Sequence, residues 1–162
     1  MSIQQRVHNK SGRSEINVAT VADQEFQTWV HVLATTMHRA DKNQTEVQGL
    51  CYSPCLIYPA GDGRVTVDRR KVAYAYQIMA RAILGQEALQ QVEASKTAES
   101  LVISHLCGTR NCMQVSHMVL ETKRVNDERT HCHFCMRKSN VRPFIYCAHN
   151  PACGSEVRYD TL

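Results

Sequence analysis

Hydrophobic residues in the first third of the chain recur first at helical and then at strand-like intervals. Five of them fall on one face of a helix: Phe26, Trp29, Val30, Leu33 and Met37. This spacing predicts a helix over residues 21–38, and Thr20 with Asp23 resembles a capping box at its start. Short apolar runs at residues 47–52 and 56–58 then predict two strands.

Alternating positions and glycines predict the elements in the middle of the chain. The turn signal Gly61-Asp62-Gly63 precedes an alternating segment, which predicts a hairpin strand over residues 64–67. A helix is expected over residues 74–84, where Gly85 would end it, and a second short helix over residues 87–94. A strand and two helices therefore separate the first cysteines from the remaining ones.

Two apolar strands and a polar helix are predicted for residues 101–130. Residues 101–103 and 118–121 are the apolar runs, and residues 122–130 are polar with helical character. Two strands joined by a loop and followed by a helix form a ββα unit. The expected fold class is therefore α+β, a small mixed domain with a ββα core.

Length and composition fit one globular domain. The chain has 162 residues, of which 43% are hydrophobic and 21% charged, and a single core usually spans about 100–200 residues. Residues 1–20 are polar without an apolar period, so we expect a flexible N-terminal arm followed by a single domain over residues 21–162. No apolar run approaches the roughly 20 residues that cross a bilayer, so no membrane partner is expected.

Eight cysteines and eight histidines point to zinc rather than to disulfides. The N-terminus lacks the apolar centre of a secretory signal, so the thiols are expected to stay reduced. Thiolate and imidazole are the ligands that zinc prefers, and a structural zinc site takes four of them. The net charge of +4 permits a polyanionic partner without requiring one.

The loop of the ββα unit supplies three of the four ligands of a first zinc site. These are Cys107, Cys112 and His117. A cysteine from the segment of Cys51 and Cys55 is expected to complete the Cys3His set. We assign Cys51 to this position, with Cys55 as the alternative.

A second set of ligands follows between residues 132 and 153. Its members are Cys132, Cys147, His149 and Cys153. Cys135 is an alternative to Cys132, because Cys132-x2-Cys135 has the spacing of a chelating pair. Two structural zinc ions per chain are therefore expected, and they would support a core in which only 6% of residues are aromatic.

Residues 104–153 resemble the His-Cys box of homing endonucleases, the nuclear intron-encoded relatives of the ββα-metal (HNH-like) nucleases. The family pattern is matched in order by Ser104-His105-Leu106-Cys107, Cys112, His117, Leu120-Glu121, Asn126, Arg129, Cys132 and Cys147-x-His149-x3-Cys153. Upstream, Cys51-Tyr52 and the basic segment near Arg70 resemble the family's first zinc cysteine and its active-site arginine.

This resemblance implies a site-specific endonuclease that hydrolyses phosphodiester bonds of double-stranded DNA. It further implies two structural Zn²⁺ ions and one catalytic Mg²⁺ per chain, a homodimer and a nuclear location. Only nine residues follow Cys153, fewer than in the tail with which the family's best-known members embrace the second subunit. The dimer contact surface is therefore not predicted.

Three residues carry the chemistry that the resemblance implies. His105 would be the general base, since neutral imidazole takes a proton from water near physiological pH. Asn126 would bind Mg²⁺ through its amide oxygen, and Arg70 would hold a phosphate oxygen. One ion with one protein ligand leaves sites for phosphate oxygens and water, so it can stabilise the phosphorane and the departing 3′ oxygen.

DNA contacts are expected on the strand and turn around residues 64–71. The basic and polar residues there are Arg64, Thr66, Arg69, Arg70 and Lys71. A two-stranded β-ribbon fits the major groove, where Arg and Lys reach guanine edges and phosphates. This segment is therefore the predicted DNA-binding ribbon.

Two other functions are alternatives to a site-specific endonuclease. A less specific ββα-metal nuclease would share His105 and Asn126 but lack the extended base recognition. A zinc-stapled nucleic-acid-binding module without catalysis would need the zinc ligands, but would have no use for a base and a hard metal ligand.

Overall fold

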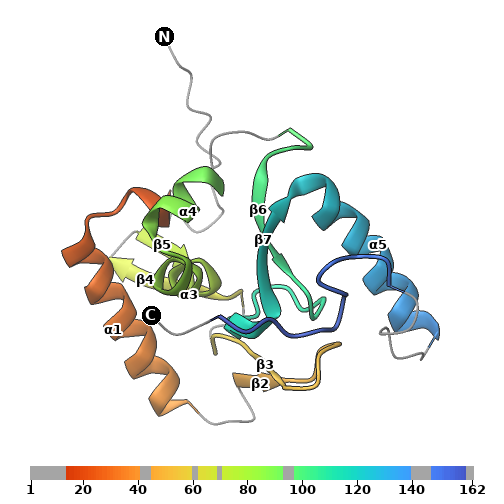
Figure 1. Cartoon of the computed structure of the whole chain (residues 1–162). Coiled ribbons are helices and arrows are strands. Elements are labelled where there is room, and N and C mark those ends of the chain that lie inside the picture. Colours follow the sequence, from red (N-terminus) through yellow and green to blue (C-terminus); the bar gives the residue numbers. More distant parts are fainter. Residues whose placement is uncertain are drawn as a thin grey trace.

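The computed structural model describes residues 14–40, 45–59, 62–68, 71–92, 97–139 and 147–159 (Figure 1). Its helices are α1 (Asp23–Arg39), α3 (Ala75–Leu84), α4 (Gln86–Val92) and α5 (Lys123–Ser139), with 3-10 turns η1 (Val18–Thr20) and η2 (Val115–His117). Its strands are β1 (Ser14–Glu15), β2 (Glu46–Val47), β3 (Cys55–Leu56), β4 (Arg64–Asp68), β5 (Lys71–Tyr74), β6 (Leu101–His105) and β7 (Met118–Thr122). The expected small mixed domain is confirmed.

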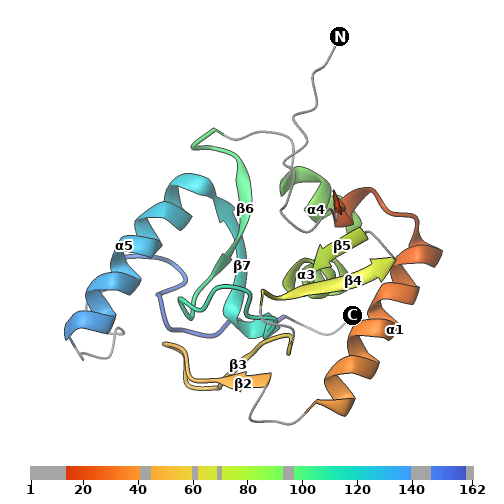
Figure 2. The same ribbon diagram turned by 180° about the vertical axis from the view of Figure 1, so that it is seen from behind.

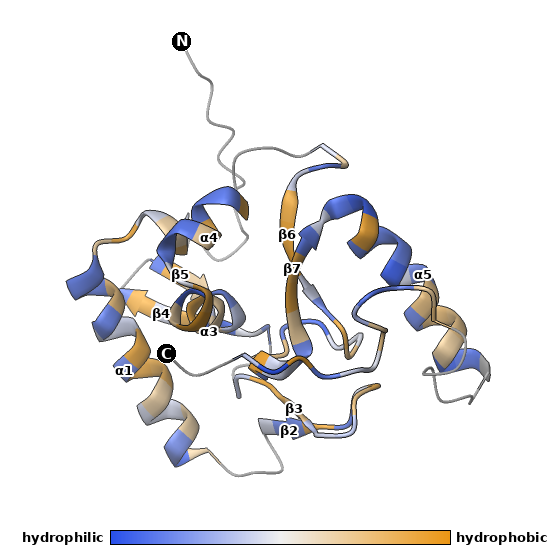
Figure 3. Cartoon of the chain, in the orientation of Figure 1, coloured by the Kyte–Doolittle hydropathy of each residue, from blue (hydrophilic) through white to orange (hydrophobic). Residues whose placement is uncertain are grey.

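Strands β6 and β7 lie in the middle of the molecule. In both views they separate α5 from the layer formed by α3, α4, β4 and β5, with α1 at the outer side of that layer (Figure 1 and Figure 2). Figure 3 shows hydrophobic residues along β6 and β7, beside a hydrophilic first half of α5. None of the helices in the described ranges is long and apolar enough to cross a membrane.

Helix α1 forms where the apolar spacing predicts it, with Phe26, Trp29 and Leu33 buried. The predicted capping box is wrong, because Ala22 occupies the N-cap and makes no side-chain hydrogen bond there. Asp23 instead accepts a hydrogen bond from Arg81 Nη2 at 2.8 Å. The Asp23 carboxylate therefore binds the buried side chain of Arg81 instead of capping the helix.

Residues 14–20 belong to the folded domain rather than to a flexible arm. Val18 and Ala19 are each only 1% exposed. Buried Arg81 holds the segment by donating to the carbonyl oxygens of Val18 and Val21 at 2.7 and 2.8 Å. The predicted arm is thus wrong over its last seven residues, while residues 1–13 lie outside the described residues.

Strands β4 and β5 form the predicted β-ribbon. They pair antiparallel with Thr66 opposite Val72, and the register shifts between Thr66 and Asp68. Strand β1 pairs parallel to β5, so the ribbon belongs to a three-stranded sheet in the order β1-β5-β4. Val65 lies opposite Ala73, and both belong to the main core. Val72, which lies opposite Thr66 on the other face, is also buried. Both faces of the ribbon therefore pack in part, while Thr66 and Lys71 are exposed.

Helices α3 and α4 follow the predictions closely. Gly85 ends α3 with a φ of 84°, a left-handed conformation that glycine adopts without steric cost. Residues 93–94 of the second predicted helix lie outside the described residues. The main core lies between α1, α3, α4 and the three-stranded sheet, and its largest buried side chains include Trp29, Ile78 and Val65.

The segment between α1 and β4 contains less strand than predicted. Strands β2 and β3 pair antiparallel over two residues each, so the predicted strand over residues 47–52 ends at Val47. The chain then turns toward the loop after β6, where Leu50 N–H donates to the Cys107 carbonyl at 3.0 Å. The first pair of cysteines is therefore held against the ββα unit.

Strands β6 and β7 and helix α5 form the predicted ββα unit. The strands pair antiparallel from Leu101 opposite Thr122 to His105 opposite Met118. Helix α5 follows β7 directly and packs against both strands. The unit is the frame that positions the loop between His105 and Met118.

Helix α5 extends to Ser139 instead of ending near residue 130. The additional turns are held by Arg129, His133 and Met136, which are buried on one face at i, i+4 and i+7. Two of these three side chains are polar. Hydrophobic periodicity therefore gave no sign that this part of the chain packs as a helix.

Candidate metal centres and the ββα unit

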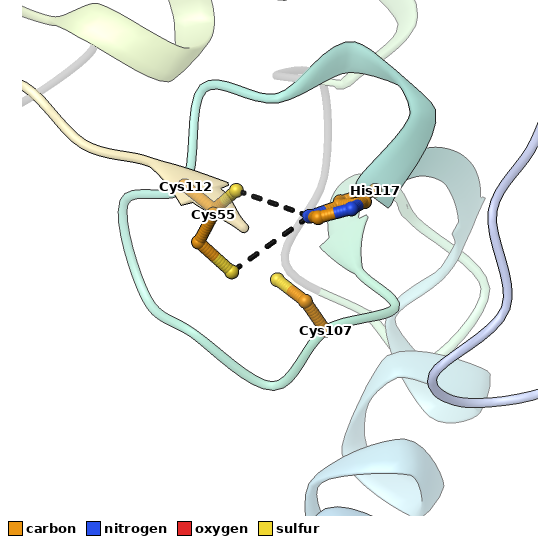
Figure 4. Close-up of side chains that lie close together, drawn as sticks. All are labelled: Cys55, Cys107, Cys112 and His117. Atoms are coloured by element: carbon orange, nitrogen blue, oxygen red, sulfur yellow. Dashed lines mark hydrogen bonds between the residues drawn. The ribbon is translucent and has the colours of Figure 1, made fainter. Parts of the chain in front are cut away.

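Three cysteines and one histidine meet beneath the ββα unit (Figure 4). Cys55 comes from β3, Cys107 and Cys112 from the loop after β6, and His117 from η2; all four are buried. His117 Nδ1 lies 3.7 Å from Cys55 Sγ and 3.6 Å from Cys112 Sγ. The four ligand atoms all lie within 4.8 Å of one another.

The structure places Cys55, not Cys51, in this first cluster. Ile57 is bridged to Cys112, and Met113 N–H donates to the Leu56 carbonyl at 2.6 Å, so β3 runs beside the ligand loop. Cys51 is also buried, but its thiol donates to the Ser155 carbonyl at 3.2 Å. The assignment of Cys51 is therefore corrected to its alternative Cys55.

The second cluster contains the four residues that the sequence predicted, Cys132, Cys147, His149 and Cys153. His149 Nδ1 lies 3.3 Å from Cys147 Sγ and 3.5 Å from Cys153 Sγ, and the thiols of Cys132 and Cys147 lie 3.8 Å apart. Cys135 is exposed on α5 outside this cluster, with its thiol 3.7 Å from His131 Nε2.

Both clusters have the dimensions of a tetrahedral zinc site. Zinc–sulfur bonds of about 2.3 Å and zinc–nitrogen bonds of about 2.0 Å put tetrahedral ligands about 3.6–3.8 Å apart. The sulfur–nitrogen distances of 3.6 and 3.7 Å in the first cluster and the sulfur–sulfur distance of 3.8 Å in the second lie in this range, and the sulfur–nitrogen distances of 3.3 and 3.5 Å in the second are slightly shorter. None of the eight cysteines, all of which lie in the described ranges, is part of a disulfide. The residues present therefore fit two Cys3His zinc sites.

Gly49 lies against the first cluster and leaves room for it. A Cβ atom at this position would lie 2.5 Å from Cys55 Sγ and 3.2 Å from Cys107 Cβ. Any larger residue would push the thiol of Cys55 out of place. The residues next to Gly49 in the sequence gave no sign of this contact.

His105 ends β6, on the rim of the loop that carries the first cluster. Its Nε2 lies 3.0 Å from the Cys112 carbonyl oxygen. Because a carbonyl only accepts hydrogen bonds, Nε2 carries a proton, and in the neutral imidazole the lone pair is then on Nδ1. The imidazole is half-buried, and burial lowers its pKa below the ordinary value of 6.5. The lowered pKa favours the neutral form of His105, in which Nδ1 is the acceptor nitrogen.

Tyr76 packs its ring edge-to-face against His105, with ring centroids 5.1 Å apart. Tyr76 in turn contacts Tyr74, at a centroid distance of 5.6 Å. Burial raises the pKa of Tyr76, so its hydroxyl is protonated throughout the physiological range. This aromatic contact fixes the histidine ring from the side of α3, and sequence spacing gave no signal for it.

Asn126 lies in the first turn of α5 and is half-buried. Its backbone carbonyl accepts a hydrogen bond from Thr130 Oγ1 at 3.1 Å. Among the described residues, its side-chain amide has no hydrogen-bond partner. Asn126 and His105 therefore lie on elements of the ββα unit that pack together, with the amide oxygen available to another ligand.

The predicted DNA-binding ribbon is described in part. Thr66 and Lys71 are exposed on β4 and β5. Arg64 is half-buried: its guanidinium donates to Tyr74 Oη at 3.2 Å and lies 3.4 Å from an Asp62 carboxylate oxygen. The predicted residues Arg69 and Arg70 lie outside the described residues.

A family model described as the zinc-binding loop region of homing endonuclease matches residues 57–161, more than half of the chain. The chain therefore belongs to the family that carries this zinc-binding region, and the match supports a nuclease-like function and zinc as the bound metal. No curated protein and no solved structure matches the chain.

Proposed function

We propose that this chain is a His-Cys box homing endonuclease that cuts double-stranded DNA at a specific site. In this proposal His105 is the general base, Asn126 is the protein ligand of one Mg²⁺ and Arg70 holds a phosphate oxygen. The zinc clusters then have a structural role.

The proposal rests on the hydrogen bonding of the His105 imidazole. Its Nε2–H is engaged with the Cys112 carbonyl at 3.0 Å, so the acceptor nitrogen is Nδ1. A zinc ligand would have to turn a ring nitrogen toward the thiols, as His117 does at 3.6 and 3.7 Å. A binding module has no need for a histidine held in this way, which favours catalysis.

The reaction follows from the lone pair on Nδ1. His105 takes a proton from a water molecule, the water oxygen attacks phosphorus, and the bond from phosphorus to the 3′ oxygen breaks. The Asn126 amide oxygen would hold Mg²⁺, which would supply positive charge to stabilise the crowded phosphorus centre and the departing 3′ oxygen until that oxygen takes a proton from solvent. The amide oxygen of Asn126 fits this role because it is a hard, neutral donor without a described competing partner.

Sequence specificity is assigned to the predicted DNA-binding ribbon. Thr66 and Lys71 are exposed there and can reach bases or phosphates in the major groove. Arg64 is already paired with Asp62 and Tyr74, which favours a role in shaping the ribbon. Two copies of the ribbon in a homodimer would read two half-sites, and the family resemblance favours action on nuclear DNA.

The test is cleavage of randomised duplex DNA by the full zinc-loaded chain. The DNA is incubated with and without Mg²⁺, and the cut ends are sequenced, with His105→Ala as the control for a contaminating nuclease. A single recurrent motif that requires Mg²⁺ supports the proposal. Scattered ends would favour a less specific ββα-metal nuclease, and DNA that is bound but intact would favour a binding module.

A further inference from the structure

The two ring nitrogens of His117 face in opposite directions. Nδ1 faces the thiols of Cys55 and Cys112, whereas Nε2 lies 2.9 Å from Ser53 Oγ. Ser53 Oγ lies 2.8 Å from Glu156 Oε1, and the Ser53 N–H donates to the same oxygen at 2.7 Å. A fully buried imidazole is thus joined, through one hydroxyl, to a carboxylate that is 35% exposed.

Chemistry fixes the direction of each hydrogen bond in this chain. An ionised carboxylate only accepts, so the Ser53 hydroxyl donates to Glu156. The Ser53 oxygen must then accept from His117 Nε2–H. With its proton on Nε2, the neutral imidazole has its lone pair on Nδ1, the atom that faces the thiols. The tautomer that a metal requires is therefore set by residues outside the cluster.

Glu156 belongs to a segment that starts in the second cluster. Cys153 is a member of that cluster, and the chain then runs past the first one. Gly154 N–H donates to the Leu106 carbonyl at 2.7 Å, and Val157 N–H donates to the Ser116 carbonyl at 2.7 Å. Leu106 and Ser116 are each adjacent to a member of the first cluster. The second cluster thus anchors the segment 153–157, which places Glu156 close to His117.

We infer that Ser53 and Glu156 are positioning residues of the first zinc site, and that through Glu156 this site depends on the segment anchored by the second. The inference concerns zinc retention and goes beyond the proposed nuclease function. It holds or fails whether or not the chain cuts DNA. Coupling of this kind is reciprocal, so each zinc ion strengthens binding of the other.

The experiment measures transfer of zinc from the loaded full-length chain to a chromophoric chelator. Two release phases are expected, and the phase that Cys55→Ser abolishes is assigned to the first site. Glu156→Gln removes the charge and Ser53→Ala removes the relay hydroxyl. Glu99→Gln is the matched control, because Glu99 is an exposed carboxylate paired with Arg124. Loss of such an outer partner typically weakens metal binding about 10–100-fold.

We expect Glu156→Gln and Ser53→Ala to speed release from the first site about 10–100-fold, with second-site release changed less and Glu99→Gln unchanged. Ser53→Thr, which keeps the hydroxyl, should restore slow release. In ¹⁵N NMR of the loaded chain, the Nε2–H signal of His117 should shift in Ser53→Ala. Zinc release at the wild-type rate from both Glu156→Gln and Ser53→Ala would overturn the inference. Equal acceleration of release from both zinc sites would also overturn it, because that result indicates general destabilisation.

A separate variant tests the dependence of the first site on the second. Cys153→Ser removes a ligand of the second cluster while leaving every residue of the first cluster in place. We expect zinc release from the first site to accelerate in this variant as well. First-site release at the wild-type rate would refute the coupling between the two sites.

Discussion

Arg129 and Glu121 form a doubly hydrogen-bonded ion pair inside the protein. Arg129 Nε donates to Glu121 Oε1 at 2.7 Å, and Nη2 donates to Oε2 at 2.9 Å. The two side chains are only 1% and 10% exposed. Arg129 Nη1 also donates to the Pro151 carbonyl at 2.7 Å and lies 3.5 Å from Cys153 Sγ. One guanidinium therefore joins β7, α5 and the second cluster.

Breaking this pair should destabilise the fold strongly. Arg129→Met leaves the carboxylate of Glu121 buried without its partner, which costs about 3–5 kcal/mol of unfolding free energy. Urea unfolding of the zinc-loaded chain measures the loss. Arg124→Met is the control, because Arg124 pairs with Glu99 and Glu128 on the surface; exposed pairs contribute about 0–1 kcal/mol. Equal losses in the two variants would contradict the role given to Arg129.

Zinc content should separate Cys55 from Cys51. The wild-type chain is expected to hold two zinc ions, and Cys55→Ser to hold one, because it removes a member of the first cluster. Cys51→Ser should keep two, since the Cys51 thiol donates to the Ser155 carbonyl at 3.2 Å. Elemental analysis of the purified proteins gives the counts. Loss of zinc from Cys51→Ser, with retention in Cys55→Ser, would restore the assignment made from the sequence.

Removal of the His105 imidazole should slow cleavage strongly without loss of zinc. His105→Ala is expected to slow DNA cleavage by about 10²–10⁴-fold, the usual contribution of a general base. Zinc content should remain at two, because His105 Nε2 contacts the Cys112 carbonyl and the ring is not a member of either cluster. Single-turnover cleavage and elemental analysis are measured on the same preparation. Release of a zinc ion by this variant would make His105 a structural ligand instead.

Asn126→Ala should separate cleavage from DNA binding. The variant is expected to lose Mg²⁺-dependent cleavage, because the amide oxygen is the proposed ligand of the catalytic ion. Specific binding should persist, since recognition is assigned to the ribbon of β4 and β5. Binding is measured by titration of labelled duplex in the absence of Mg²⁺, and cleavage is measured in its presence. Normal cleavage would show that Asn126 is only a solvated helix residue.

Features that depend on residues close together in the chain could be predicted from the amino-acid sequence. Apolar spacing predicted α1, and alternation after a glycine turn predicted β4, because side-chain periodicity follows directly from backbone geometry. The spacing of Cys107, Cys112 and His117 likewise identified three ligands of the first cluster, since a short loop can bring such neighbours to one metal. Cys147, His149 and Cys153 of the second cluster were predicted on the same grounds, and the structure places Cys132 rather than its alternative Cys135 beside them.

Features that depend on partners far apart in the chain became visible only from the packing of the elements. Cys51 and Cys55 have similar local surroundings, and the pairing of β3 with the loop around Cys112 selects Cys55. The additional turns of α5 rest on buried polar contacts that hydrophobic periodicity does not report. Ser53 and Glu156 meet across 103 residues of sequence. Such contacts arise from how the elements pack, and local spacing carries no information about them.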